Sequence, residues 1–122
     1  MATLNNWVAA FDKGDKKAAI ATCADEMVIL DDIPPYQWRP PGACQKWWVA
    51  AEKSGITNTK TTLGKPRHFE VTGDRAYVVI PVDITYTIKG KAKKQSGATV
   101  TATLKNGDSG WRFIGWSWAD PD

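Results

Sequence analysis

Apolar side chains recur at helical spacing in the N-terminal half of the chain. The first stripe, at i, i+3, i+4 and i+7, consists of Leu4, Trp7, Val8 and Phe11. This periodicity predicts a helix that Thr3 or Asn5 caps and that Gly14 ends. Asp15 is expected to cap a second, short helix from Lys16 to Cys23.

A third helix is predicted from Ala43 to Lys53, with Ser54 and Gly55 as its stop. Its apolar side carries Cys44, Trp47, Trp48 and Ala51. From Thr57 onward the period changes to two, and glycine-containing turns separate the apolar runs. We therefore expect an antiparallel meander of three or four long strands after the helices.

The clearest strand runs from Ala76 to Ile88. Even-numbered residues, including Tyr86, share one face that should meet the helices, while Tyr77 and Val79 share the other. Pro81 lacks an amide hydrogen, so it predicts a bulge or bend halfway along the strand.

The last strand alternates between two faces as well. Phe113, Gly115 and Ser117 fall on one face, which we predict to be inward and to leave room for a ligand near Ser117. Trp116 and Trp118 then join Tyr77 and Val79 on the outer face. An apolar surface of that size predicts a homodimer.

The run from Met27 to Leu30 ends at two adjacent acids, Asp31 and Asp32. Burial of the run would carry a carboxylate to the rim of an apolar interior, where loss of water raises its pKa and suits it to act as a general base. The alternative is that both acids only accept backbone hydrogen bonds and shape the turn. Strand alternation predicts that only one of the two faces the interior.

Composition narrows the classes of partner. The 122 residues form a single predicted domain, 1–122, with a net charge of +3 and basic residues scattered among 13 acids. Without a basic face we expect no nucleic acid, and without a long apolar segment no membrane, so the chain is predicted to be soluble. One histidine and two cysteines predict no metal and no cofactor.

The two cysteines, Cys23 and Cys44, lie on the predicted inward faces of their helices, 21 residues apart. Either a disulfide or two buried free thiols fits this placement. A bridge would indicate an oxidising compartment and hence export. The sequence leaves the compartment open between cytoplasmic and exported.

Four segments together resemble the NTF2-like superfamily, and within it the SnoaL-like and ketosteroid-isomerase-like branch: 7–15, 23–31, 39–43 and 110–114. The resemblance implies an α+β cone in which three N-terminal helices pack in a strongly curved antiparallel sheet. It places Asp31 where ketosteroid isomerases have the carboxylate that shuttles a proton. Where those enzymes have a tyrosine that donates a hydrogen bond to the oxyanion, this chain has Trp7. Near the position of the second acid that they use at the oxyanion, this chain has Thr99 or Val100.

Two functions follow as hypotheses. In the first, the cone binds a small apolar molecule between Trp7, Trp38, Trp47, Tyr86 and Ser117, and Asp31 acts as its acid or base. If this protein is an enzyme, it is then a proton-transfer enzyme of the isomerase or cyclase type. In the second, a non-catalytic homodimeric module or ligand carrier fills its cone with aromatic side chains.

Overall fold

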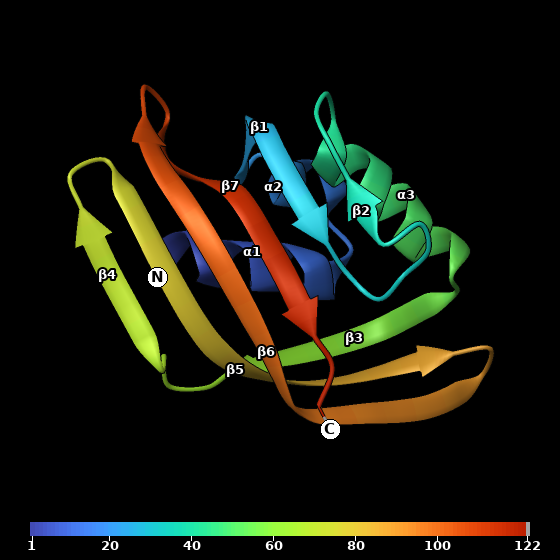
Figure 1. The fold of residues 1–122 in the computed structure, drawn as a ribbon. Coiled ribbons are helices and arrows are strands. Elements are labelled where there is room, and N and C mark those ends of the chain that lie inside the picture. Colours follow the sequence, from blue (N-terminus) through green and yellow to red (C-terminus); the bar gives the residue numbers. More distant parts are fainter. Residues whose placement is uncertain (122) are drawn as a thin grey trace.

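The computed structural model describes residues 1–121 (Figure 1). Its helices are α1 (Ala2–Lys13), α2 (Lys16–Ile20) and α3 (Ala43–Lys53). Its strands are β1 (Cys23–Leu30), β2 (Gln37–Trp38), β3 (Ile56–Leu63), β4 (His68–Thr72), β5 (Arg75–Ile88), β6 (Lys91–Gly107) and β7 (Gly110–Ala119). Among the described residues no helix is long and apolar enough to cross a membrane.

All the strands belong to one sheet, in the order β2-β1-β7-β6-β5-β3, with β4 paired to the first half of β5. Every pairing is antiparallel except that of β1 with β7, which is parallel. The expected α+β cone is confirmed, but the prediction of a wholly antiparallel sheet is wrong at this pair. The strand that follows α2 runs alongside the last strand of the chain, so the sheet is mixed.

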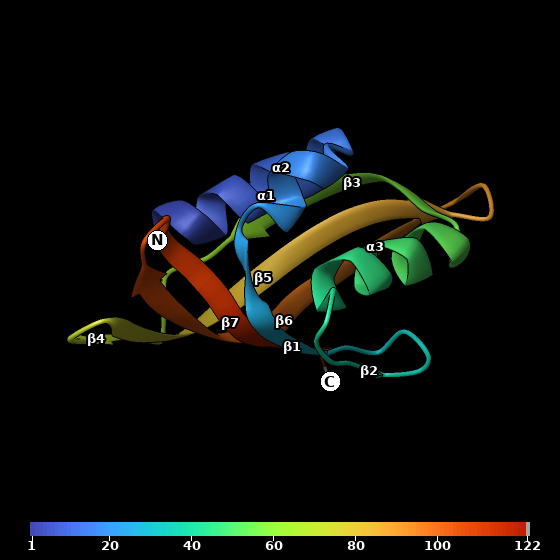
Figure 2. The ribbon, with the colours of Figure 1, turned by 90° about the horizontal axis from the view of Figure 1, so that it is seen from above.

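The sheet curls around the helices, which lie on its concave side (Figure 2). Part of the curvature comes from β5, whose register with β6 shifts between Val82 and Ile84, next to Pro81. The backbone approaches closely here, because the Gly64 amide donates to the Pro81 carbonyl at 2.8 Å and a Cβ at position 64 would lie 2.9 Å from Pro81 Cγ. The predicted irregularity near Pro81 is confirmed.

The ends of the first two helices differ in part from expectation. No side chain caps α1, which begins after Met1, so the predicted caps at Thr3 and Asn5 are wrong. Gly14 ends α1 with a φ of 71°, and Asp15 caps α2 by accepting from the Ala18 amide at 3.1 Å, both as predicted.

The second helix is shorter than predicted because its last residues belong to the sheet. It ends at Ile20, and the Thr22 carbonyl then accepts from the Phe113 amide at 2.8 Å. This bond starts the pairing of β1 with β7, so Cys23 is the first residue of a strand and not the last of a helix.

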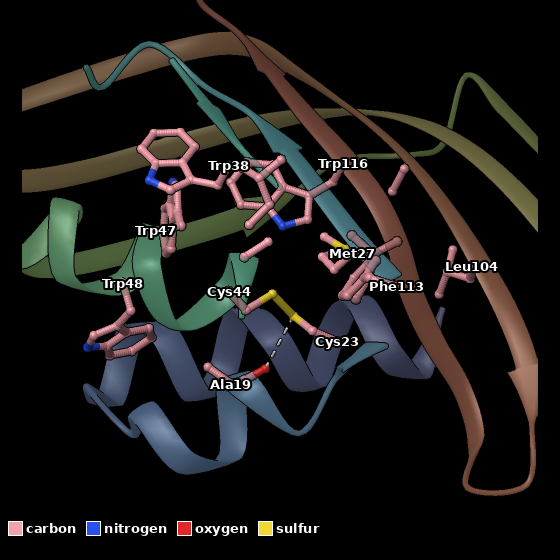
Figure 3. Packing of buried hydrophobic residues seen from close by; sticks show 14 of the residues in the cluster. Ala19, Cys23, Met27, Trp38, Cys44, Trp47, Trp48, Leu104, Phe113 and Trp116 are labelled. Atoms are coloured by element: carbon pink, nitrogen blue, oxygen red, sulfur yellow. Dashed lines mark hydrogen bonds between the residues drawn. A yellow bond between two sulfur atoms is a disulfide. The ribbon is translucent and has the colours of Figure 1, made fainter. Parts of the chain in front are cut away.

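The interior contains an aromatic cluster made of Trp7, Phe11, Trp47, Trp48 and Trp116. The ring centroids of neighbouring pairs lie 5.3 to 6.4 Å apart, in stacked, tilted and edge-on arrangements that aromatic rings favour. Figure 3 labels the cluster indoles Trp47, Trp48 and Trp116, of which Trp48 lies below α3 in this view. The cluster thus joins α1 and α3 to β7 by aromatic packing.

A disulfide between Cys23 and Cys44 ties the start of β1 to the first turn of α3 (Figure 3). Both half-cystines are buried in the core. Of the two arrangements that the sequence left open, the structure has the bridge. The bridge joins residues with a sequence separation of 21. In the chain-entropy description, closing such a loop in the unfolded chain stabilises the folded state by about 3 kcal/mol.

The last strand reverses its faces halfway. Gly115 pairs with Thr103, but Phe113 pairs with Leu104, so Ile114 is an extra residue in β7. This bulge turns Phe113, Trp116 and Trp118 toward the interior, where Trp116 is only 9% exposed. The predicted inward face of Ser117 and outward faces of Trp116 and Trp118 are therefore wrong.

Candidate functional site

A cavity of about 330 Å³ lies between the helices and the concave face of the sheet. Most of its lining is apolar. The aromatic part of the lining consists of Trp7, Phe11, Trp47, Tyr86, Phe113, Trp116 and Trp118. The aliphatic part includes Leu4, Val8, Ile33, Ile56, Leu63, Val82, Ile84, Ile88 and Val100.

Asp31 follows the last residue of β1 and lines this cavity. Its Oδ2 accepts from Trp47 Nε1 at 2.8 Å, and its Oδ1 accepts from the Asp32 amide at 2.7 Å. Burial raises the pKa of Asp31, and these two hydrogen bonds oppose the rise because they stabilise the ionised form. Each oxygen keeps a lone pair for a bound molecule.

Asp32 lines the cavity as well, contrary to the prediction that only one of the two acids would face it. Strand alternation does not reach this position, since β1 ends at Leu30. The chain turns there in a loop that the Asp31 amide closes by donating to the Tyr36 carbonyl at 3.2 Å. The Asp31 side chain also accepts a backbone hydrogen bond in this turn, from the Asp32 amide, which is the alternative role considered for the two acids.

A third carboxylate belongs to the same end. Asp120 follows β7, lies beside the Asp32 side chain and accepts from Trp118 Nε1 at 2.9 Å. Loss of water raises the pKa of Asp32 and of Asp120. The neighbouring Asp31 adds to the rise at Asp32, and Asp32 adds to the rise at Asp120, whereas the interaction with Asp120 lowers the pKa of Asp32. We refer to Asp31, Asp32 and Asp120 as the acidic end of the cavity.

The structure brings together only part of the predicted pocket. Trp7, Trp47 and Tyr86 line the cavity with Asp31. Trp38 is buried in the core opposite Ile29 and is not part of the lining, and neither is Ser117, which pairs with Thr101.

Several of the residues missed by the sequence analysis depend on the turn after β1 or on the bulge in β7. Asp32, Asp120, Trp116 and Trp118 are the main ones. The adjacent carboxylates at the end of an apolar run were a usable signal, but nothing local marks Ile114 as an extra residue.

Trp116 carries a buried polar atom without a partner. Its Nε1 is the one such side-chain atom among residues 1–121. Because the atom is wholly covered by protein, it is not a donor for a ligand in this conformation.

The remaining predicted positions lie outside the cavity. Tyr77 is 42% exposed and Val79 half-buried on the outer sheet face. The single histidine, His68, is exposed, and its Nε2 lies 3.2 Å from Glu70 Oε2. Across residues 1–121 no three His, Cys, Asp or Glu side chains are arranged to hold a metal ion.

Comparison with known proteins finds relatives by structure. No protein-family model matches the sequence, and no curated protein matches it. An NTF2-like superfamily protein from Salmonella enterica superposes with a TM-score of 0.85 at 14% identity, over 99% of this chain and 87% of the other. The protein has an NTF2-like fold.

Two further structures with this fold are similar. One is a ketosteroid isomerase-like protein from Erwinia carotovora, with a TM-score of 0.81 at 16% identity over 99% of this chain and 92% of that one. The other is a hexachlorocyclohexane dehydrochlorinase (LinA), with a TM-score of 0.84 at 11% identity over 98% and 81%. At these identities the likeness concerns the fold, which supports many chemistries.

Proposed function

We propose that this protein binds a small, largely apolar molecule in the cavity and that Asp31 moves a proton on it. The observation that carries the proposal is the placement of Asp31: a carboxylate on an apolar wall, fixed by Trp47 Nε1 at 2.8 Å. A raised pKa brings a carboxylate closer to the strength that a general base needs near neutral pH.

The proposed step is a proton transfer without any cofactor. Ionised Asp31 takes a proton from a carbon next to a carbonyl group, and the electron pair of that bond moves onto the carbonyl. The protonated carboxyl then returns the proton to the same carbon or, where a double bond is conjugated with the enolate, to the carbon at its far end. The electron pair moves back from the oxygen, re-forms the carbonyl group and supplies the new C–H bond. The resemblance of this position to the proton-shuttling carboxylate of ketosteroid isomerases supports this role.

Proton exchange tests the proposal directly. Apolar ketones are incubated with the protein in deuterated water, and loss of the signal of the acidic C–H group is followed by NMR. We expect Asp31→Asn to slow the catalysed exchange by roughly 100-fold or more, the usual contribution of a general base. Asp25→Asn, which removes an exposed carboxylate of β1 outside the cavity, is the matched control. Exchange that is no faster than in buffer would refute the catalytic role.

A ligand carrier is the second candidate. This role is favoured because the donors at the acidic end are already in use: the N–H groups of Trp47 and Trp118 donate to Asp31 and Asp120. A developing oxyanion there would have few free donors. Saturable ligand quenching of tryptophan fluorescence without proton exchange would favour the carrier.

We also propose a homodimer. Its apolar surface is smaller than the sequence suggested, because Trp116 and Trp118 face the interior. The register places Tyr77 beside Thr103 and Val79 beside Thr101 on the outer sheet face. We expect light scattering to give twice the 13.4 kDa mass of the chain, and Tyr77→Glu to halve it. A wild-type protein with the mass of one chain would contradict the dimer.

A further inference from the structure

The charged side chains that line the cavity are all acidic. Asp31 and Asp32 are in the lining, Asp120 contacts Asp32, and no Lys, Arg or His among residues 1–121 belongs to the lining. The chain as a whole has 16 basic residues and a net charge of +3. The cavity therefore has the opposite charge to the molecule around it.

The acidic end is rich in acceptors. Trp47 Nε1 and Trp118 Nε1 already donate to Asp31 and Asp120, and the Gln95 amide is the other polar side chain of the lining near Asp120. The Asp32 amide donates to Asp31. A molecule bound here is thus offered carboxylate oxygens with free lone pairs, and these suit a hydrogen-bond donor better than a carbonyl or carboxylate group.

The walls next to the acidic end suit a cation too. Trp7, Trp47 and Trp118 line the cavity, and indole is the side chain whose ring face attracts cations most strongly. Two basic residues, Lys91 and Lys93, pair across the sheet with the lining residues Ile88 and Tyr86. Both are exposed at the β5–β6 hairpin and do not line the cavity.

From the cavity, its aromatic walls and its excess of acceptors, we infer that the bound molecule is a hydrophobic amine whose ammonium group meets Asp31, Asp32 and Asp120. This inference rests on the proposed function, since it takes the cavity as the binding site. Asp31 lies partly buried in the apolar lining, where an ionised carboxylate favours a counter-charge, and the lining described for residues 1–121 contains no basic side chain to supply one. Asp32 and Asp120 are exposed and add negative charge at the same end. Burial raises the pKa of Asp31, which agrees with its loss of hydration.

A matched set of naphthalenes tests the inference by calorimetry near neutral pH. The set is 2-naphthylmethylamine, 2-naphthalenemethanol, 2-acetonaphthone and 2-naphthoate, which share one ring system and differ in the polar group. We expect the amine to bind roughly tenfold or more tightly than the alcohol, as hydrogen bonds to charged groups commonly provide. The ketone should bind no better than the alcohol, and the carboxylate should show no binding.

Two variants locate the effect. Asp32→Asn should weaken the amine by roughly tenfold and leave the alcohol unchanged, because only the amine carries the charge. Asp31→Asn should act in the same direction and serves if the first variant unfolds. Asp25→Asn changes net charge equally outside the cavity and should change neither affinity.

The outcomes separate this inference from the proposal beneath it. If the ketone or the alcohol binds and the amine binds no tighter, the inference is wrong and the cavity is still a binding site. If naphthoate binds best, the inference is also wrong. If none of the four compounds binds, both the inference and the proposed binding function fail.

Discussion

The aromatic cluster and the acidic end of the cavity are built on opposite principles. In the cluster, ring centroids lie 5.3 to 6.4 Å apart, and the disulfide lies in the same core. At the acidic end, three carboxylates with raised pKa values crowd together without a cation in the lining. Dense packing stabilises the fold, whereas like charges that lose water cost stability, and carboxylates with shifted pKa values are found more often at functional sites than elsewhere in proteins.

Trp47 belongs to both regions. Its ring packs against Trp7 and Trp116, while its Nε1 donates to Asp31. The same side chain therefore contributes to stability and sets the position of the proposed base. Substitutions can separate the two contributions. We expect the largest effects on stability from changes in the cluster and the smallest from changes at the acidic end.

The largest effect is expected from Trp116→Ala, which removes a buried ring from the aromatic cluster. We expect the free energy of unfolding to fall by about 3 to 5 kcal/mol, measured by urea denaturation. The matched control is Trp116→Phe, which keeps a ring and removes the unpaired buried N–H. It should cost much less. Equal losses in both variants would show that the indole itself, and not ring packing, is needed.

The second largest loss of stability is expected from removal of the disulfide. Replacing Cys23 and Cys44 by alanine is expected to lower stability by about 3 kcal/mol and Tm by roughly 10 °C, because the unfolded chain regains the freedom of the 21-residue loop. A thermal melt of the wild type with reductant should show a similar drop. An unchanged Tm in both experiments would mean that the bridge adds nothing to the packing.

Trp47→Phe should have a smaller effect on stability and a distinct effect on titration. The ring remains in the cluster, but a hydrogen bond to a charged group is lost, worth roughly 1.5 to 3 kcal/mol. The pKa of Asp31 should rise further, since this bond favours the ionised form. Carboxyl ¹³C NMR titration measures it, and a lower pKa in the variant would contradict the structure.

The smallest expected effect concerns the pH dependence of stability at Asp31. Its folded pKa lies above the ordinary 3.8, so its favourable contribution is complete below that value and is lost as pH rises through the folded pKa. Asp31→Asn resembles the protonated form and should gain stability relative to wild type over this window. Denaturation at a series of pH values tests this, with Asp25→Asn as the control. A difference that shrinks as pH rises would contradict the predicted sign.

Sequence reasoning was most successful where a single period governs a whole element. The stripes of α1 and α3 and the alternation of β5 identified helices, strands and much of the core, because burial of one face constrains every turn or every second residue. The buried Ala76, Val78, Ile80 and Val82 confirm the face predicted for β5. The same rule failed in β7, where one extra residue at Ile114 exchanged the two faces.

The sequence by itself determined the order of the main helices and strands, the helix stop at Gly14 and the presence of an acid at the end of β1, since these depend on local periodicity and on turn chemistry. Tertiary structure alone decided that β1 pairs in parallel with β7 and that Asp120 joins Asp31 and Asp32. It also decided that Trp116 and Trp118 face the cavity. These features arise from contacts between residues far apart in the chain, and a shift of one residue in register changes them without any change in local pattern.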